Sequence, residues 1–219
     1  MKINQMISPA LISAIALGLF SIITTPLQAL ETFGNEGIQF ELDTIIEFEF
    51  VESNGAFQST FGVINLDTGE KTPLISEAKP SNKPQDISRP SDFQDDTGVS
   101  NQNDFLGTPG DAVPQPLAEF KFQANTRYAF YLESFYNGKP VGIIYSTNTE
   151  NPNTRQQTEF NGGIDSLAKG GNLIRWDDTG IVKAQQERDF DDFIVRVGGH
   201  QTCPSSSNVL ASVKCLTQN

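Results

Sequence analysis

Histidine, cysteine and tryptophan are scarce in this chain of 219 residues, which has one His, two Cys and one Trp. The single histidine, His200, follows an apolar run within Gly-Gly-His-Gln. A lone histidine in a loop is far more often exposed than catalytic, and no Gly-x-Ser-x-Gly motif supplies a nucleophile. Glycine-rich phosphate-binding motifs are absent as well. These absences argue against serine hydrolases, histidine-ligated zinc enzymes and nucleotide-binding enzymes.

Basic residues are also few: 15 Lys and Arg face 27 Asp and Glu, for a formal net charge of -12. Nucleic-acid phosphates and an anionic bilayer surface would be repelled by such a chain. The acidic balance suits an exported, soluble protein that meets divalent cations.

Long apolar runs are limited to the first 29 residues, where Lys2 is the only charge and residues 7–23 are almost wholly apolar. The segment ends at the small residue Ala29, a layout typical of a secretory signal peptide. We therefore expect export to the periplasm, the cell surface or the medium. Residues 30–200 are expected to form a single domain, without a membrane span once the signal is removed.

The two cysteines, Cys203 and Cys215, lie in the C-terminal tail, residues 201–219. In an oxidising compartment a local disulfide between them is the expected state. They do not form a zinc-ligand set with the distant His200.

Period-two alternation of Phe, Val and Ile with polar residues predicts β-strands at residues 46–51 and 57–64, and Asn54-Gly55 between them reads as a hairpin turn. Helical patterns are scarce. We therefore predict an all-β fold, an antiparallel β-sandwich, with a jelly roll as one form of it. Further strands are expected at residues 118–123, 127–135, 141–147, 172–177 and 190–197.

Residues 77–116 differ in composition, because prolines are scattered among Ser, Asn, Asp and Gly with few aliphatic side chains. Such a segment cannot bury a core, so an exposed insertion is predicted, with an interdomain linker as the alternative.

Acidic residues concentrate near the last expected strand: Asp177 and Asp178 precede Asp189, Asp191 and Asp192 by a short stretch. In an extended segment Asp189 and Asp191 would share one face and Asp192 the other. Calcium takes about six to eight oxygen ligands from carboxylates, carbonyls and water, and these five residues are candidate ligands. The alternative is that they are solvated turn residues, and residue spacing leaves both open.

A family resemblance is carried by residues 187–195, Glu-Arg-Asp-Phe-Asp-Asp-Phe-Ile-Val. They resemble the Asp-Arg-Asp-aromatic-Asn-Asp-aliphatic signature that ends the bacterial domain of unknown function 4114. Residues 176–178, Trp-Asp-Asp, are similar to that family's Phe-Glu-Asp element, and residues 145–152 to its strand and Asn-Pro turn. The similarity covers about residues 118–198 and implies a secreted or cell-surface β-rich module without established catalytic activity.

By this resemblance, the family's emphasised acid falls on Asp177 and its closing acids on Asp189 and Asp192. The chain departs from the pattern at Asp177, where the family has Glu, at Glu187, where it has Asp, and at Asp191, where it has Asn. Each departure keeps or adds a carboxylate, so a metal site would survive with altered geometry. A role that needs the longer reach of Glu is in doubt.

The sequence thus predicts a non-catalytic module that holds a structural calcium ion. One alternative is a carbohydrate-binding or adhesive module that engages cell-surface polysaccharide or an envelope protein. Its candidate stacking residues are Trp176, Tyr128, Tyr131, Tyr136 and Tyr145. Most of these are expected to be core residues instead. A second alternative is a glycoside-active enzyme with paired carboxylates, drawn from acids such as Glu133 or Asp177. The oligomeric state is not predicted.

Overall fold

A computed structural model describes residues 31–201 apart from residues 55–56, 79–108, 111, 170, 179–180 and 182–187. The predicted signal peptide, the predicted Cys203–Cys215 disulfide and most of the predicted insertion lie outside the described residues.

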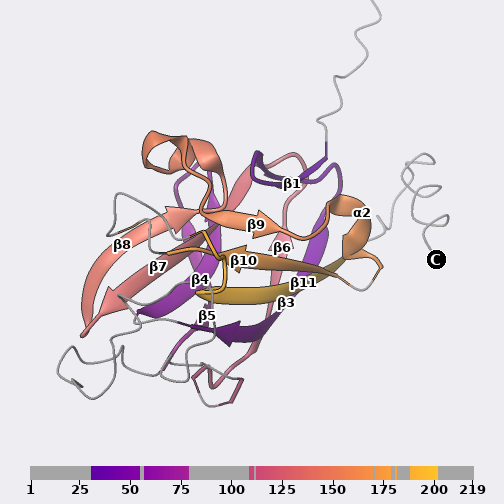
Figure 1. The fold of residues 1–219 in the computed structure, drawn as a ribbon. Helices are drawn as coiled ribbons and strands as arrows, with labels where there is room; N and C mark the ends of the chain where they lie inside the picture. Colours follow the sequence, from indigo (N-terminus) through magenta and orange to yellow (C-terminus); the bar gives the residue numbers. More distant parts are fainter. Residues whose placement is uncertain are drawn as a thin grey trace, which may run out of the picture.

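The described residues form two antiparallel sheets packed face to face, which confirms the predicted β-sandwich (Figure 1). The first sheet has the strand order β1 (Thr32–Gly34), β2 (Gly37–Gln39), β7 (Tyr128–Tyr136), β4 (Gln58–Asn65), β5 (Lys71–Ser76), with β8 (Lys139–Tyr145) also paired to β7. The second has the order β6 (Leu117–Phe122), β3 (Thr44–Ser53), β11 (Phe193–Gln201), β10 (Asn172–Trp176), β9 (Thr158–Phe160).

Strand β3 shows how the alternating sequence builds this sandwich. Ile46, Phe48 and Phe50 are almost fully buried, whereas Glu47 and Glu49 between them are exposed. Because side chains alternate faces along a strand, one face of β3 belongs to the core and the other to solvent. Strand β3 pairs with β6 on one side and β11 on the other, so it lies inside the sheet.

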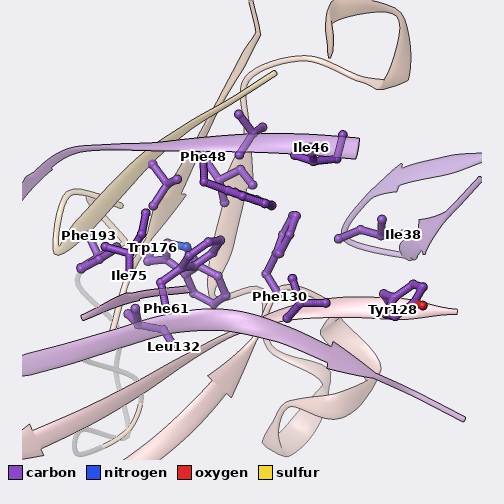
Figure 2. Close-up of a cluster of buried hydrophobic side chains, with 14 of the residues drawn as sticks. Ile38, Ile46, Phe48, Phe61, Ile75, Tyr128, Phe130, Leu132, Trp176 and Phe193 are labelled. Atoms are coloured by element: carbon purple, nitrogen blue, oxygen red, sulfur yellow. The ribbon is translucent and has the colours of Figure 1, made fainter. Parts of the chain in front are cut away.

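Aromatic side chains from both sheets fill the space between them (Figure 2). The ring of Phe61, on β4, lies 5.6 Å from that of Phe48, 5.3 Å from Phe130, 6.2 Å from Trp176 and 6.3 Å from Phe193, centroid to centroid. Such ring pairs contribute roughly 0.5–1.5 kcal/mol each beyond their buried area. Phe61 therefore joins the two sheets.

The predicted hairpin between residues 46–51 and 57–64 is wrong. Strands β3 and β4 belong to different sheets: β3 pairs with β6 and β11, and β4 pairs with β5 and β7. The chain crosses from one sheet to the other near Asn54, whose backbone N–H donates to the carbonyl of Asp192. Both strands bury an apolar face, and placing them in opposite sheets lets the two faces meet.

The hairpin between β4 and β5 is stabilised locally by Asn65. Its Oδ1 accepts the backbone N–H groups of Asp67 and Thr68 at 2.9 and 3.2 Å. Asx side chains that bond the backbone two residues ahead favour turns. Gly69, with φ of 75°, completes the turn.

Strand β11 begins at Phe193, three residues later than predicted, because Arg188 and Phe190 have φ values of 64° and 57°. Non-glycine residues in this left-handed region do not continue a strand. Strand β11 also extends through His200, which the sequence had placed in a loop.

The connection between β8 and β9 contains the 3-10 turns η1 (Asn148–Glu150) and η2 (Pro152–Thr154), joined by Asn151. The Asn151 side chain is buried, accepts the N–H of Tyr145 at 2.8 Å, and donates to the carbonyls of Tyr145, Thr147 and Arg155 at 2.7, 3.2 and 3.1 Å. One amide thus fixes both ends of the loop.

Three residues near the ends of the predicted insertion are buried, although Ala78, Pro114 and Gln115 beside them are exposed as predicted. Glu77, Ala112 and Val113 are buried, and the N–H of Ala78 donates to the carbonyl of Ala112 at 2.7 Å.

A short helix, α2 (Ile164–Leu167), precedes β10. Among the described residues no helix is long and apolar enough to cross a membrane.

Candidate metal centre

The five predicted ligands gather at one end of the sandwich because β10 and β11 are antiparallel neighbours. Trp176, the last residue of β10, is paired with Phe193, the first of β11, and both are fully buried. Asp177 and Asp178 therefore leave β10 where Asp192 enters β11.

Asp178 and Asp192 are bonded to each other across this junction. The N–H of Asp192 donates to the carbonyl of Trp176 at 3.1 Å, and Asp192 Oδ2 accepts the N–H of Asp178 at 2.6 Å. Asp178 Oδ2 in turn accepts from Ser134 Oγ at 3.4 Å. Both aspartates are buried, so the hydrogen bonds that their carboxylates accept already stabilise the fold.

Asp177 is also fully buried, and it anchors the segment that leads into β11. Its N–H donates to the carbonyl of Gln157 at 3.0 Å, and its Oδ2 accepts the backbone N–H of Arg188 at 2.9 Å. Backbone N–H donors are the usual partners of buried carboxylates.

Of the five aspartates, Asp189 has the fewest partners to stabilise the negative charge of its carboxylate. Both of its carboxylate oxygens are shielded from solvent and accept no hydrogen bond of ordinary geometry from the other described residues. Burial, followed by the negative charges of Asp191 and Asp177, raises the pKa of Asp189 to about 6. Asp191 is within hydrogen-bonding reach, but two carboxylates can bond only if they share a proton.

This arrangement can do one of two things chemically. A cation placed among Asp177, Asp189 and Asp191 would offset their repulsion, and so would a proton shared by Asp189 and Asp191. Among the described residues, no three or more His, Cys, Asp or Glu groups converge in the manner of a metal site. An ion would therefore have to draw the carboxylates closer together.

The extended segment expected around Asp189 is not observed, because Arg188 and Phe190, on either side of Asp189, have left-handed backbone conformations. Asp189 nevertheless lies within reach of Asp191, and Asp192 accepts the N–H of Asp178.

A second group of buried polar side chains lies at the same end and was missed in the sequence. The group consists of Glu77, Ser53, Ser59 and Ser134, all at most 6% exposed. Ser59 and Ser134 are in phase with Phe61 and Leu132, at positions that alternation assigns to the core. A polar residue at a predicted core position was the signal that could have revealed them.

The predicted stacking residues are mostly core residues. Trp176, Tyr128 and Tyr131 are at most 4% exposed, and only Tyr136 and Tyr145 are half-buried. Tyr131 lies against Gly62 of the neighbouring strand, with the ammonium of Lys71 over its ring at 5.5 Å from the centroid. Neither face of that ring is open to a sugar.

Comparisons with family models, curated proteins and solved structures produce no match for this chain. The resemblance to domain of unknown function 4114 stays a prediction.

Proposed function

We propose that this protein is a non-catalytic, exported β-sandwich module that binds one calcium ion through Asp177, Asp189 and Asp191. The observation that carries the proposal is Asp189, whose two shielded oxygens face like charges and accept no hydrogen bond of ordinary geometry from the other described residues. In the proposal Asp178 and Asp192 orient the two chain segments rather than bind the ion, because each already holds a hydrogen bond across the junction.

The effect of the ion would be structural. It would join the end of β10 to the segment before β11 and so stabilise the C-terminal part of the second sheet. Modules that meet calcium outside the cell bind it with dissociation constants of roughly 10⁻⁴–10⁻³ M, a range suited to this site of few ligands. A polysaccharide or protein of the cell envelope is the kind of partner such a module would meet.

Thermal unfolding of the purified chain with chelator, with 10 mM calcium and with 10 mM magnesium tests the proposal. If the dissociation constant is about 10⁻⁴ M, calcium should stabilise the fold by about 2.7 kcal/mol, and magnesium much less. Asp189→Asn should abolish the calcium effect. It should also raise the stability in chelator, because the variant removes an ionised carboxyl that burial and like charges disfavour.

Asp67→Asn is the matched control, since Asp67 is exposed in the β4–β5 turn and its own side chain is not needed for that turn's Asn65 bonds. The calcium shift should persist in this control. If the wild-type chain is equally stable in chelator and in calcium, the calcium proposal is wrong. A proton shared by Asp189 and Asp191 would then be the remaining explanation of how their repulsion is offset.

A further inference from the structure

Strand β6 forms an edge of the second sheet and has a long, regular backbone. It runs for six residues, Leu117–Phe122, without proline or glycine, and its register with β3 has no shift. Its outer side pairs with no other strand in the part of the chain that the structure describes. An edge strand of this kind offers unpaired N–H and C=O groups to another chain.

The other sheet edges carry features that block such pairing. Strand β5 contains Pro73, and its register with β4 shifts beside that residue. Strand β8 contains Pro140, and the side chain of Ile181 occupies the space beside its Gly142. Strands β1 and β9 have only three residues each. Short strands, prolines, bulges and covering segments all protect edges, and β6 has none of them. Instead, β6 begins with Leu117, which is 71% exposed.

The hydrogen-bond pattern of β6 shows which of its backbone groups are free. The N–H of Phe50 donates to the carbonyl of Pro116 at 2.7 Å, and the pair Phe48↔Ala118 follows two residues further along each strand. In an antiparallel ladder alternate pairs are hydrogen-bonded, so the even-numbered positions of β6 turn their backbone groups toward β3. The odd-numbered positions therefore turn theirs toward the open side.

Two of these odd-numbered positions, Glu119 and Lys121, have opposite charges and exposed side chains on the same face of the sheet. Glu47 lies directly opposite Glu119 on β3, and like charges at such positions repel. Lys121 contacts Asp43 at 2.7 Å, but its side chain is 56% exposed. Because an ammonium group has three donors, Lys121 can bind a second carboxylate.

We propose that two copies of this chain join edge to edge through β6, in the antiparallel register that places Phe120 opposite Phe120 of the second copy. In this register Glu119 of each copy faces Lys121 of the other, so twofold symmetry forms the ion pair twice. Each Glu119–Lys121 pair also exchanges two backbone hydrogen bonds, because both positions turn their backbone groups outward. A shift by two residues would place Glu119 opposite Glu119, or Lys121 opposite Lys121. The charges therefore select one register.

Phe120 gives this arrangement an apolar contact. Its side chain is only partly buried, and its ring lies 4.8 Å from that of Phe122 and 5.8 Å from that of Tyr128, centroid to centroid. The two copies of Phe120 form a non-hydrogen-bonded pair, the kind in which side chains lie closest. The free edge ends at Gln123, whose N–H donates to the Tyr128 hydroxyl at 3.4 Å. Because so short an edge buries little surface, we expect a dissociation constant on the order of 10⁻⁴ M.

The dimer does not depend on the proposed calcium site, since none of the proposed calcium ligands lies on β6. Sedimentation equilibrium of the full chain, in chelator and at concentrations from about 10 to about 500 µM, measures the association. A salt concentration of 0.15 M screens the general repulsion between two acidic chains. The wild-type chain should pass from mostly monomer to mostly dimer across this range.

Charge reversals test the register. Glu119→Lys and Lys121→Glu each place like charges opposite one another twice, so each should weaken the dimer at least about 10-fold. An equimolar mixture of these two variants should associate within about 3-fold of the wild-type chain, because one then carries two cations on β6 and the other two anions. Glu36→Lys is the matched control: Glu36 is exposed in the β1–β2 turn, and its reversal should leave the dissociation constant within about 2-fold.

The proposal is wrong if the wild-type chain stays monomeric over the whole range, if either single variant dimerises as strongly as the wild-type chain, or if the mixture of folded variants stays monomeric. Should a single variant not fold, the double variant Glu119→Lys, Lys121→Glu decides the matter, because it exchanges the two charges and keeps the net charge. It should dimerise like the wild-type chain, and a monomeric double variant that is folded would overturn the register.

Discussion

Replacing Asn151 with Ala should be among the most destabilising single changes in this chain. The substitution removes four hydrogen-bond contacts within one buried loop, and leaves the N–H of Tyr145 and three carbonyls with fewer partners. Because the amide nitrogen carries two hydrogens, its three contacts amount to two full bonds; with the accepted bond, about 1 kcal/mol each gives a loss of roughly 3 kcal/mol. For a domain of this size that lowers the melting temperature by about 10 °C.

Chemical denaturation at pH 7 would measure this loss, with Asn161→Ala as the control. Asn161 is exposed, also lies in a turn, and its replacement should change the free energy of unfolding by less than about 0.5 kcal/mol. Asn151→Asp should be worse than Asn151→Ala at pH 7, because a carboxylate would face three carbonyl oxygens, and it should recover on acidification. A loss below about 1 kcal/mol for Asn151→Ala would refute the reasoning.

Two other changes test the packing described above. Phe61→Ala should cost about 3–5 kcal/mol in urea unfolding, because Phe61 is fully buried between the sheets, whereas Leu117→Ala at a 71% exposed position should be nearly neutral. A Phe61→Ala loss below about 2 kcal/mol would contradict a central role for this ring. Gly171→Ala should be more destabilising than Gly69→Ala, although both residues have positive φ. A Cβ at Gly171 would lie 2.5 Å from the carbonyl oxygen of Val197, while one at Gly69 would meet nothing within 4 Å. Equal losses in the two variants would show that backbone strain alone sets the cost.

Two central strands could be predicted because apolar residues recur at second positions along them. Residues 46–51 became part of β3, where Ile46, Phe48 and Phe50 alternate with polar residues. Residues 57–64 became β4 within a few positions, although Ser59 interrupts the apolar series there. The short strands β1, β2 and β9 span only three residues each, too few for a period to emerge. Strands β1 and β2 pair with each other locally, whereas the pairing of β2 with β7 joins segments distant in sequence.

The residues of the candidate site could be predicted from the sequence, but their arrangement in space could not. The five aspartates meet because β10 and β11 pair, and that pairing is a property of the whole sheet. Nothing in the spacing of Asp189 and Asp191 indicates that Arg188 and Phe190 adopt left-handed conformations between them. The Asn54-Gly55 pair, a common hairpin sequence, misled for the same reason: local turn preference does not specify which sheet receives the next strand.

The pairing of β3 with β11 has a consequence for how this chain reaches its structure. Arg196 and Glu49, which form a 2.6 Å ion pair across these strands, are 147 residues apart in sequence. Closing so long a loop costs conformational entropy before the contacts between the two strands form. Folding should therefore be slow, with a rate that depends on topology more than on stability. Until β11 arrives, β3 presents an unpaired edge beside a phenylalanine-rich face, the combination that invites association between chains. A ribosome-bound or truncated chain that ends before Phe193 should therefore be collapsed and prone to aggregation rather than partly folded into a native-like sandwich.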